Sequence, residues 1–377
     1  MKLFRCQHCG QVLYFENVQC ERCGHRLGYL PETETLSALE PEGDDWRTLA
    51  QPAGTVRFCA NAAYDACNWL VPTGSADTYC AACRHNLTVP SLDNPDNVAA
   101  WRKLEFGKHR LIYTLLRLRL PLRTRAEDPE HGLAFEFLAD EPQAFGPKVM
   151  TGHDNGLITI ALAEADDAER EKRRISMHEP YRTLLGHFRH EVGHHYWDLL
   201  VRDGGRLDEF RALFGDERED YNAALQRHYN EGAPADWQDN FVSTYATSHP
   251  WEDFAETWAH YLHILDTLEM AAAFGMRVDP VVTNDPALTA DVDLDPYCTG
   301  NVQQLVEPWL PLCFALNSLN RAMGMSDAYP FILSVPAIEK LGFIHSLVHT
   351  HGDAADTERT GDRSHDARLV QGVGTAA

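Results

Sequence analysis

Two histidines and a glutamate in the middle of the chain are spaced for metal chemistry. His190, Glu191 and His194 form the pattern H-E-x-x-H inside the segment YRTLLGHFRHEVGHHYWDLLV. Apolar residues recur there at helical spacing without a proline, which predicts a helix over 181–201. A separation of four residues places both imidazoles on one face, where they can bind one zinc ion. Glu191 would project beside that ion and take a proton from its bound water. An amphipathic core helix with a polar patch is the alternative interpretation.

A second helix, predicted over 251–270, carries further candidate ligands. Glu252 and Glu256 are four residues apart and therefore share one face of that helix. A catalytic zinc needs three protein ligands and one open position, so one glutamate can complete the site. The other can accept the N–H of a liganding histidine and fix its tautomer. The spacing alone leaves open which glutamate does which. Favourable charge at a helix N-terminus is the alternative for Glu252, but it explains Glu256 less well.

Eight of the ten cysteines lie in the first 83 residues and form two sets of four. The first set is Cys6, Cys9, Cys20 and Cys23, and the second set is Cys59, Cys67, Cys80 and Cys83. Pairs spaced C-x2-C fit a tight turn around a tetrahedral ion, so each set predicts a structural zinc site. Gly10 and Gly24 directly follow two of these pairs, where a positive φ is often needed. Disulfides are the alternative, which a reducing compartment disfavours.

The segments around these motifs suggest a division of the chain. We expect a zinc ribbon at 1–32, a linker and second four-cysteine module at 33–90, and a catalytic domain at 91–350. The acidic, turn-rich stretch 33–51 is the predicted linker. The tail 351–377 lacks aromatic residues and apolar periodicity, which predicts disorder.

Two further segments of the expected catalytic domain bear on the site. Strands are predicted over 133–138 and 156–162, and the second could offer an edge to an extended peptide. The mixed-charge run 164–174 is typical of a solvated helix face.

These motifs together resemble a family of bacterial zinc-binding metallopeptidases that carry an N-terminal zinc ribbon and a gluzincin-type core. The resemblance rests on CQHCG near the N-terminus, RTLLGHFRHEVGHHYW, PWEDFAETWAHYLHI, and the segment 317–348. It implies an α+β, mainly helical fold with a zincin-like catalytic domain. It also implies that His190, His194 and Glu252 bind zinc, that Glu191 is catalytic and that Glu256 supports a ligand. Tyr245 stands where related gluzincins place a tyrosine that stabilises the oxyanion; a packed loop aromatic is the alternative.

The expected function is therefore hydrolysis of peptide bonds, with one catalytic and two structural zinc ions. A zinc-stabilised adaptor with a catalytically silent metal site is the alternative, and an intact Glu191 favours the enzyme. The chain has 377 residues and a formal charge of −23, which disfavours phosphate backbones and anionic membrane surfaces as partners. We expect a peptide or protein substrate, protein docking through the ribbons, no nucleic-acid or membrane partner, and a cytoplasmic location.

Overall fold

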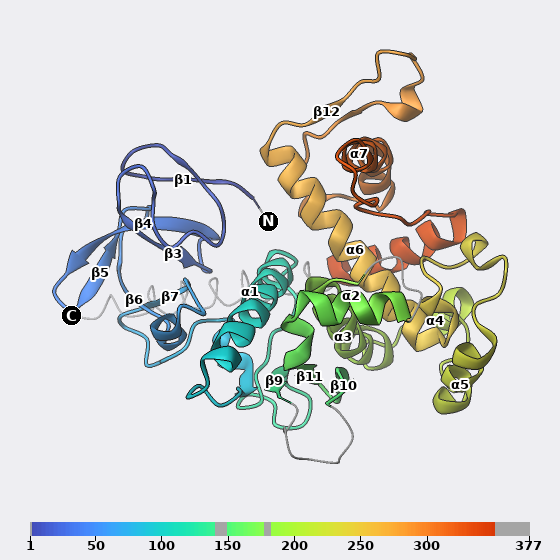
Figure 1. The fold of residues 1–377 in the computed structure, drawn as a ribbon, viewed down its shortest axis with the longest axis horizontal. Helices are drawn as coiled ribbons and strands as arrows, with labels where there is room; N and C mark the ends of the chain where they lie inside the picture. The colour runs from blue at the N-terminus through green and yellow to red at the C-terminus, as the bar shows by residue number, and fades with distance from the viewer. Residues whose placement is uncertain (1, 140–148, 177–181, 351–377) are drawn as a thin grey trace, which may run out of the picture.

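The computed structural model describes residues 2–139, 149–176 and 182–350. About 46% of the chain is helical and 15% lies in strands, so the expected mixed and mainly helical α+β composition is confirmed. The predicted disordered tail, 351–377, lies outside the described residues. Figure 1 shows the N-terminal strands on one side of the molecule and most of the helices on the other, with α1 between them.

The N-terminal part consists of a hairpin and one antiparallel sheet. The hairpin pairs β1 (Phe4–Arg5) with β2 (Val12–Leu13). The sheet follows the order of the chain through β3 (Arg26–Leu30), β4 (Thr35–Glu42), β5 (Asp45–Thr48), β6 (Thr55–Phe58) and β7 (Leu70–Pro72). A bridge between Tyr29 and Trp69 brings the two ends of this sheet together.

The stretch expected to be a linker is part of this sheet. Residues 33–51 form β4 and β5, which join β3 of the first cysteine module to β6 and β7 of the second. Leu36 and Ala38 are fully buried, whereas Glu42 lies at the exposed end of β4. The acidic and turn-forming residues therefore mark the end of a strand, and the prediction of a linker was wrong.

A second, mixed sheet has the order β10-β11-β9-β8. Its strands are β8 (Asn86–Thr88), β9 (Ala134–Leu138), β10 (Gly152–Asp154) and β11 (Leu157–Ala161). β8 and β9 are parallel, as are β9 and β11, while β10 is antiparallel to β11. β11 therefore lies inside the sheet, so the expectation of a free edge at 157–162 was wrong, and β10 and β8 are the edge strands. β8 belongs to this sheet although it closely follows Cys83, the last cysteine of the second set.

Helices make up most of the remaining described chain. They are α1 (Pro95–Arg117), α2 (Asp167–Ser176), α3 (Leu184–Tyr196), α4 (Leu207–Phe214), α5 (Tyr221–Glu231), α6 (Pro250–Ala273), α7 (Gln303–Ala322) and a last helix at 335–350. A short hairpin, β12 (Arg277–Val278) with β13 (Ala290–Asp291), separates α6 from α7. The predicted metal helices thus exist as α3 and α6, and they pack against each other (Figure 1).

One continuous hydrophobic core links the two parts of the molecule. Phe15, Tyr29 and Trp69 of the N-terminal part meet Tyr113 of α1 in an aromatic cluster, with ring centroids of Phe15 and Tyr113 5.2 Å apart. On its other side α1 packs against α3, where Gly107 faces Phe188. α1 therefore connects the cysteine modules to the helix that carries H-E-x-x-H.

Candidate metal centre

The helix α3 presents the two histidines to one side and its apolar residues to the core. Thr183 caps its N-terminus by accepting a hydrogen bond from the main-chain N–H of Gly186. Phe188, Val192 and Tyr196 are fully buried. A Cβ at Gly193 would lie 3.1 Å from the Cα of Ala255, so glycine inside the motif lets α6 approach closely.

The helix α6 begins next to these histidines. His249 caps it, because its Nδ1 accepts a hydrogen bond from the N–H of Trp251, and Pro250 occupies the first turn. Glu252 therefore lies in the first turn and Glu256 in the second. Both carboxylates face α3, where the sequence pattern expects them.

Three potential ligand atoms converge between the two helices. Nε2 of His190 lies 2.9 Å and Nε2 of His194 3.5 Å from Oε2 of Glu252, and one ligand atom from each residue falls within 4.8 Å of the others. Oε2 of Glu252 is buried and accepts no hydrogen bond from the described residues. A buried carboxylate oxygen facing two imidazole nitrogens fits a divalent cation, because His and carboxylate ligands are those that zinc takes.

Two outer contacts hold these ligands. Oε1 of Glu256 lies 2.7 Å from Nδ1 of His190, and its other oxygen accepts a hydrogen bond from Oγ of Ser243 at 2.6 Å. Nδ1 of His190 therefore donates, which leaves Nε2 free for a metal. On the other side, the hydroxyl of Tyr221 donates to Oε1 of Glu252 at 2.5 Å. The structure thus places Glu252 with the Nε2 atoms and Glu256 with Nδ1.

The electrostatics of His190 and Glu252 also favour a cation between these two side chains. Burial opposes protonation of His190, but Glu252 and Glu256 outweigh it and raise its pKa well above the usual value. Burial alone would raise the pKa of Glu252, yet His194 and His190 hold it well below the usual range. The site thus holds an ionised carboxylate that demands positive charge.

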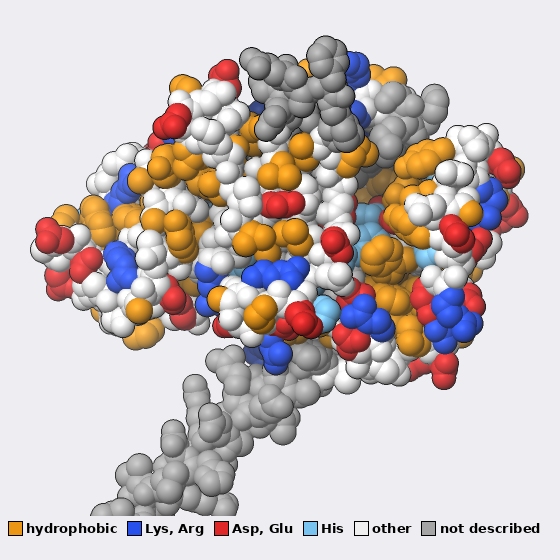
Figure 2. Space-filling view, turned by 90° about the horizontal axis from the view of Figure 1, so that it is seen from below, with side chains coloured by type: hydrophobic (Ala, Val, Ile, Leu, Met, Phe, Trp, Pro, Cys, Tyr) orange, Lys and Arg blue, Asp and Glu red, His pale blue; other side chains and the backbone are white. Residues whose placement is uncertain are grey.

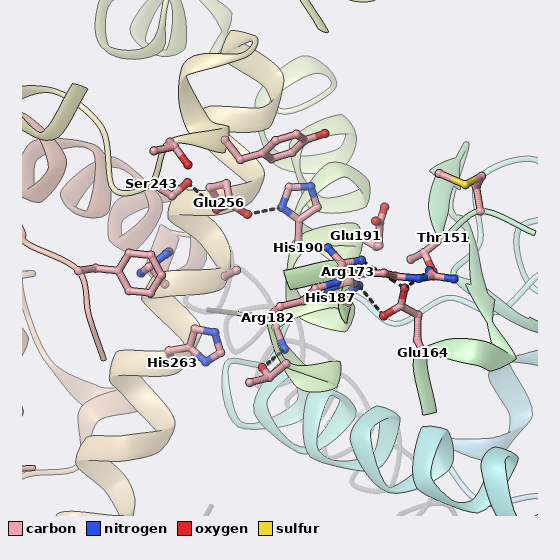
Figure 3. A pocket seen from close by; sticks show the side chains of 18 of the residues that line it. Thr151, Glu164, Arg173, Arg182, His187, His190, Glu191, Ser243, Glu256 and His263 are labelled. Atoms are coloured by element: carbon pink, nitrogen blue, oxygen red, sulfur yellow. Dashed lines mark hydrogen bonds and ion pairs between the residues drawn. The ribbon is translucent and has the colours of Figure 1, made fainter. Parts of the chain in front are cut away.

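Glu191 lines a cavity of about 230 Å³ that opens beside these ligands. No described residue donates a hydrogen bond to its carboxylate, and burial raises its pKa. Figure 3 shows Glu191 next to His190 at the cavity, with His190 and Glu256 pointing toward each other. From below, histidine side chains lie in a hollow of the surface with hydrophobic side chains beside them (Figure 2). Glu191 is partly exposed where it lines the cavity, so a substrate can reach the candidate base.

Tyr245 also lines the cavity, in a short helical turn, Tyr245–Thr247, before α6. Its ring centroid is 5.9 Å from that of His190. Burial, followed by the charge of Glu252, raises the pKa of Tyr245 well above the usual value, so the phenol stays protonated and can donate. The ring is thus placed beside the ligands, rather than packed in a loop away from them.

The opposite wall of the cavity is charged. Glu164 is buried, and Arg173 and Arg182 pair with its Oε1 at 2.6 and 3.2 Å. His187 lies beside them, and burial, then Arg182, lowers its pKa to about 3. The run 164–174 was predicted to be a solvated face; that was wrong for Glu164 and Arg173, which line the cavity.

Both cysteine sets come together in the structure. In the first set, Cys6 and Cys23 have sulfurs 3.7 Å apart, and Cys9 and Cys20 3.6 Å apart. In the second set all four side chains are buried, and two sulfurs lie 3.7 Å apart. Four sulfurs at 2.3 Å from a tetrahedral zinc are about 3.8 Å from one another, so both sets fit zinc. Gly10 and Gly24, which follow two of the C-x2-C pairs, have positive φ of 77° and 78°, as predicted for these positions.

Sequence reasoning missed two groups that contact the candidate ligands. Tyr221 and Ser243 are 31 and 13 residues from the glutamates they bond. Both lie in stretches without a metal motif, and a single tyrosine or serine carries no spacing signal. Only the packing of α5 and the loop before α6 brings them to the site.

Comparison with known proteins identifies the family of this chain. The family model described as "Putative zinc-binding metallo-peptidase" matches residues 97–347, about two thirds of the chain. The chain belongs to this family. A zinc-ribbon domain model matches residues 3–94, the part that holds both cysteine sets. The family matches therefore divide the chain between the cysteine modules and α1.

Relatives of this metallopeptidase family member occur in mycobacteria. Uncharacterized proteins of Mycobacterium tuberculosis (strain ATCC 25618 / H37Rv) and Mycobacterium bovis are each 43% identical over 349 residues, covering 92% of this chain and 95% of theirs. No solved structure matches the chain at a significant level. Among the described residues, no helix combines the length and apolar character that crossing a bilayer requires.

Proposed function

We propose that the chain is a zinc-dependent peptidase of the gluzincin type, with a zincin-like catalytic domain. The observation that carries this proposal is the convergence of His190, His194 and Glu252 beside a cavity that Glu191 lines. These three residues would hold the catalytic zinc, and Glu256 would orient His190 through Nδ1. Zinc bound there would supply Lewis acidity, lowering the pKa of water and polarising a carbonyl.

The remaining chemistry belongs to side chains of the cavity. Glu191 takes a proton from the attacking water and returns it to the amine that leaves. Its raised pKa suits this exchange, because the carboxyl must both accept and release the proton. A purely structural metal site has no use for a carboxyl group in this place, which favours a peptidase over an adaptor.

Tyr245 and β10 would position the substrate. The protonated phenol of Tyr245 can donate to the oxygen of the carbonyl under attack. β10 is an edge strand of its sheet, and His153 on this strand lies near the site, with ring centroids of His153 and His194 5.9 Å apart. An extended peptide can add to such an edge through main-chain hydrogen bonds.

The substitution Glu191→Gln tests the proposal on the zinc-loaded protein. Zinc content should stay equal to that of the wild type, while hydrolysis of a mixed peptide library falls at least 100-fold. Glu307→Gln, at an exposed position of α7, should leave both unchanged. Retained hydrolysis in Glu191→Gln would overturn the assigned base. A wild-type protein that binds three zinc ions yet cleaves nothing in the library would favour the adaptor.

The cysteine modules and the location in the cell complete the proposal. Two structural zinc ions would occupy the two sets, and the N-terminal part would serve protein docking rather than nucleic-acid binding. Eight free thiols in two zinc-binding arrangements require a reducing environment, so we place the protein in the cytoplasm, away from membrane surfaces.

A further inference from the structure

A histidine outside both cysteine modules contacts the second cysteine set. His109 lies on α1, within the part matched by the metallopeptidase model, whereas the cysteines lie in the zinc-ribbon match. Its Nε2 is 3.2 Å from Sγ of Cys67 and 3.6 Å from Sγ of Cys83. His109 and both cysteines are almost completely buried. The contact therefore belongs to a closed site that excludes water.

The other nitrogen of the ring defines what Nε2 can do. Nδ1 lies 2.6 Å from the main-chain oxygen of Glu105, one helical turn earlier. A carbonyl oxygen only accepts, so Nδ1 carries a hydrogen. An Nε2 that faces two thiolate sulfurs carries a second hydrogen, so the ring beside the zinc-bound set is an imidazolium cation. The four cysteines already supply a full tetrahedral set, which assigns Nε2 an outer role as a donor.

The charges around the set need such a donor. A zinc ion with four thiolates carries a formal charge of −2, and burying that charge without hydrogen bonds is costly. Lys108 is next to His109 on α1, but its ammonium pairs with Glu105 at 2.8 Å, and Oε2 of Glu105 itself lies 3.6 Å from Sγ of Cys83. That pair is fully buried and neutral as a whole. The main-chain N–H groups of Trp69, Cys80 and Cys83 each donate to a sulfur of the set, and His109 adds a cationic side-chain donor to them.

We propose that His109 completes the second zinc site by donating N–H···S hydrogen bonds to Cys67 and Cys83. Through this contact, zinc binding by the second set and packing of α1 stabilise each other, because linkage between two equilibria is reciprocal. The second module is then part of the catalytic domain's support rather than an independent ribbon.

The helix α1 extends this linkage to both metal helices. Gly107 faces Phe188 of α3. Thr114 donates to Asp266 of α6 at 2.9 Å. Release of zinc from the second set should therefore loosen α1 where it supports the catalytic ligands.

Alkylation of single cysteines tests this proposal on the full zinc-loaded chain. The protein is incubated with EDTA and N-ethylmaleimide, and mass spectrometry of its peptides gives a rate for each cysteine. In His109→Leu, the four cysteines of the second set should react 10- to 100-fold faster than in the wild type, the usual loss when an outer contact to a metal ligand is removed. The first set serves as an internal control and should keep its rates.

Two variants separate a donor from mere packing. His109→Gln retains an N–H and should restore most of the protection. Thr114→Val breaks the contact of α1 with α6 at a position that does not touch the sulfurs, so it should accelerate the second set far less than His109→Leu does. Unchanged rates in His109→Leu, equal acceleration in both sets, or the same selectivity in Thr114→Val would overturn the proposal. If His109→Leu does not fold, His109→Asn, whose shorter amide cannot reach the sulfurs, takes its place.

Discussion

Tyr221 is predicted to control how tightly the catalytic zinc binds, although it is not a ligand. Its hydroxyl donates to Oε1 of Glu252, whose Oε2 faces the two histidines. In Tyr221→Phe, the carboxylate loses its only described donor on that side while it stays buried. A hydrogen bond to a charged group contributes about 1.5–3 kcal/mol. Since 1.4 kcal/mol corresponds to a factor of ten, zinc should bind about 10- to 150-fold more weakly.

Competition with a graded series of chelators measures this change. The zinc content per chain is recorded at each step. One zinc ion per chain should be lost from Tyr221→Phe to a chelator of lower zinc affinity than the wild type requires. The cysteine-bound equivalents should leave as before. Tyr229→Phe is the matched control, because it removes a hydroxyl from the same helix at a position that is 61% exposed. Equal retention of zinc in Tyr221→Phe and the wild type, within twofold, would refute the reasoning.

Three other substitutions probe the site and its support. Glu256→Gln removes the carboxylate that accepts from His190 and should weaken zinc binding about 10- to 100-fold in the same competition. Gly193→Val should separate α3 from α6 and destabilise the fold by about 1–3 kcal/mol or more, seen as a lower melting temperature and lost zinc; an unchanged melt would contradict the close packing. Burial lowers the pKa of His260 to about 4, so the unfolded chain takes up a proton below pH 6.5 that the folded chain refuses. Between pH 7 and 5, the free energy of unfolding should thus fall by about 1–2 kcal/mol more in the wild type than in His260→Gln. Urea denaturation at each pH measures this difference, and an equal pH dependence of the unfolding free energy in both proteins would rule it out.

Local spacing carried most of what could be predicted. The pattern from His190 to His194 lies within one helix, so four-residue spacing alone places both imidazoles on a common face. The pairing of Glu252 with them needed the resemblance to a family, because spacing does not tell Glu252 from Glu256. The structure places these groups together as expected.

Long-range packing explains what the sequence could not show. Tyr221 reaches Glu252 only because α5 folds back on α6, and His109 reaches Cys67 across 42 residues. His109 sits in an ordinary amphipathic helix, where one histidine has no distinguishing pattern. The stretch 33–51 was misread because its acidic end dominates its composition, while Leu36 and Ala38 provide the burial of a strand.

The shared sheet of the N-terminal part has a consequence for anyone who shortens this protein. Cutting before residue 33 would remove β3 and leave one edge of β4 unpaired while the other edge stays paired with β5. A newly exposed edge of this kind invites intermolecular strand pairing. A fragment limited to 97–347 would also uncover the aromatic face of α1 at Tyr113. The boundary between the two family matches is therefore a poor place to truncate. Soluble expression should require the chain from the first cysteine pair, Cys6 and Cys9, onward.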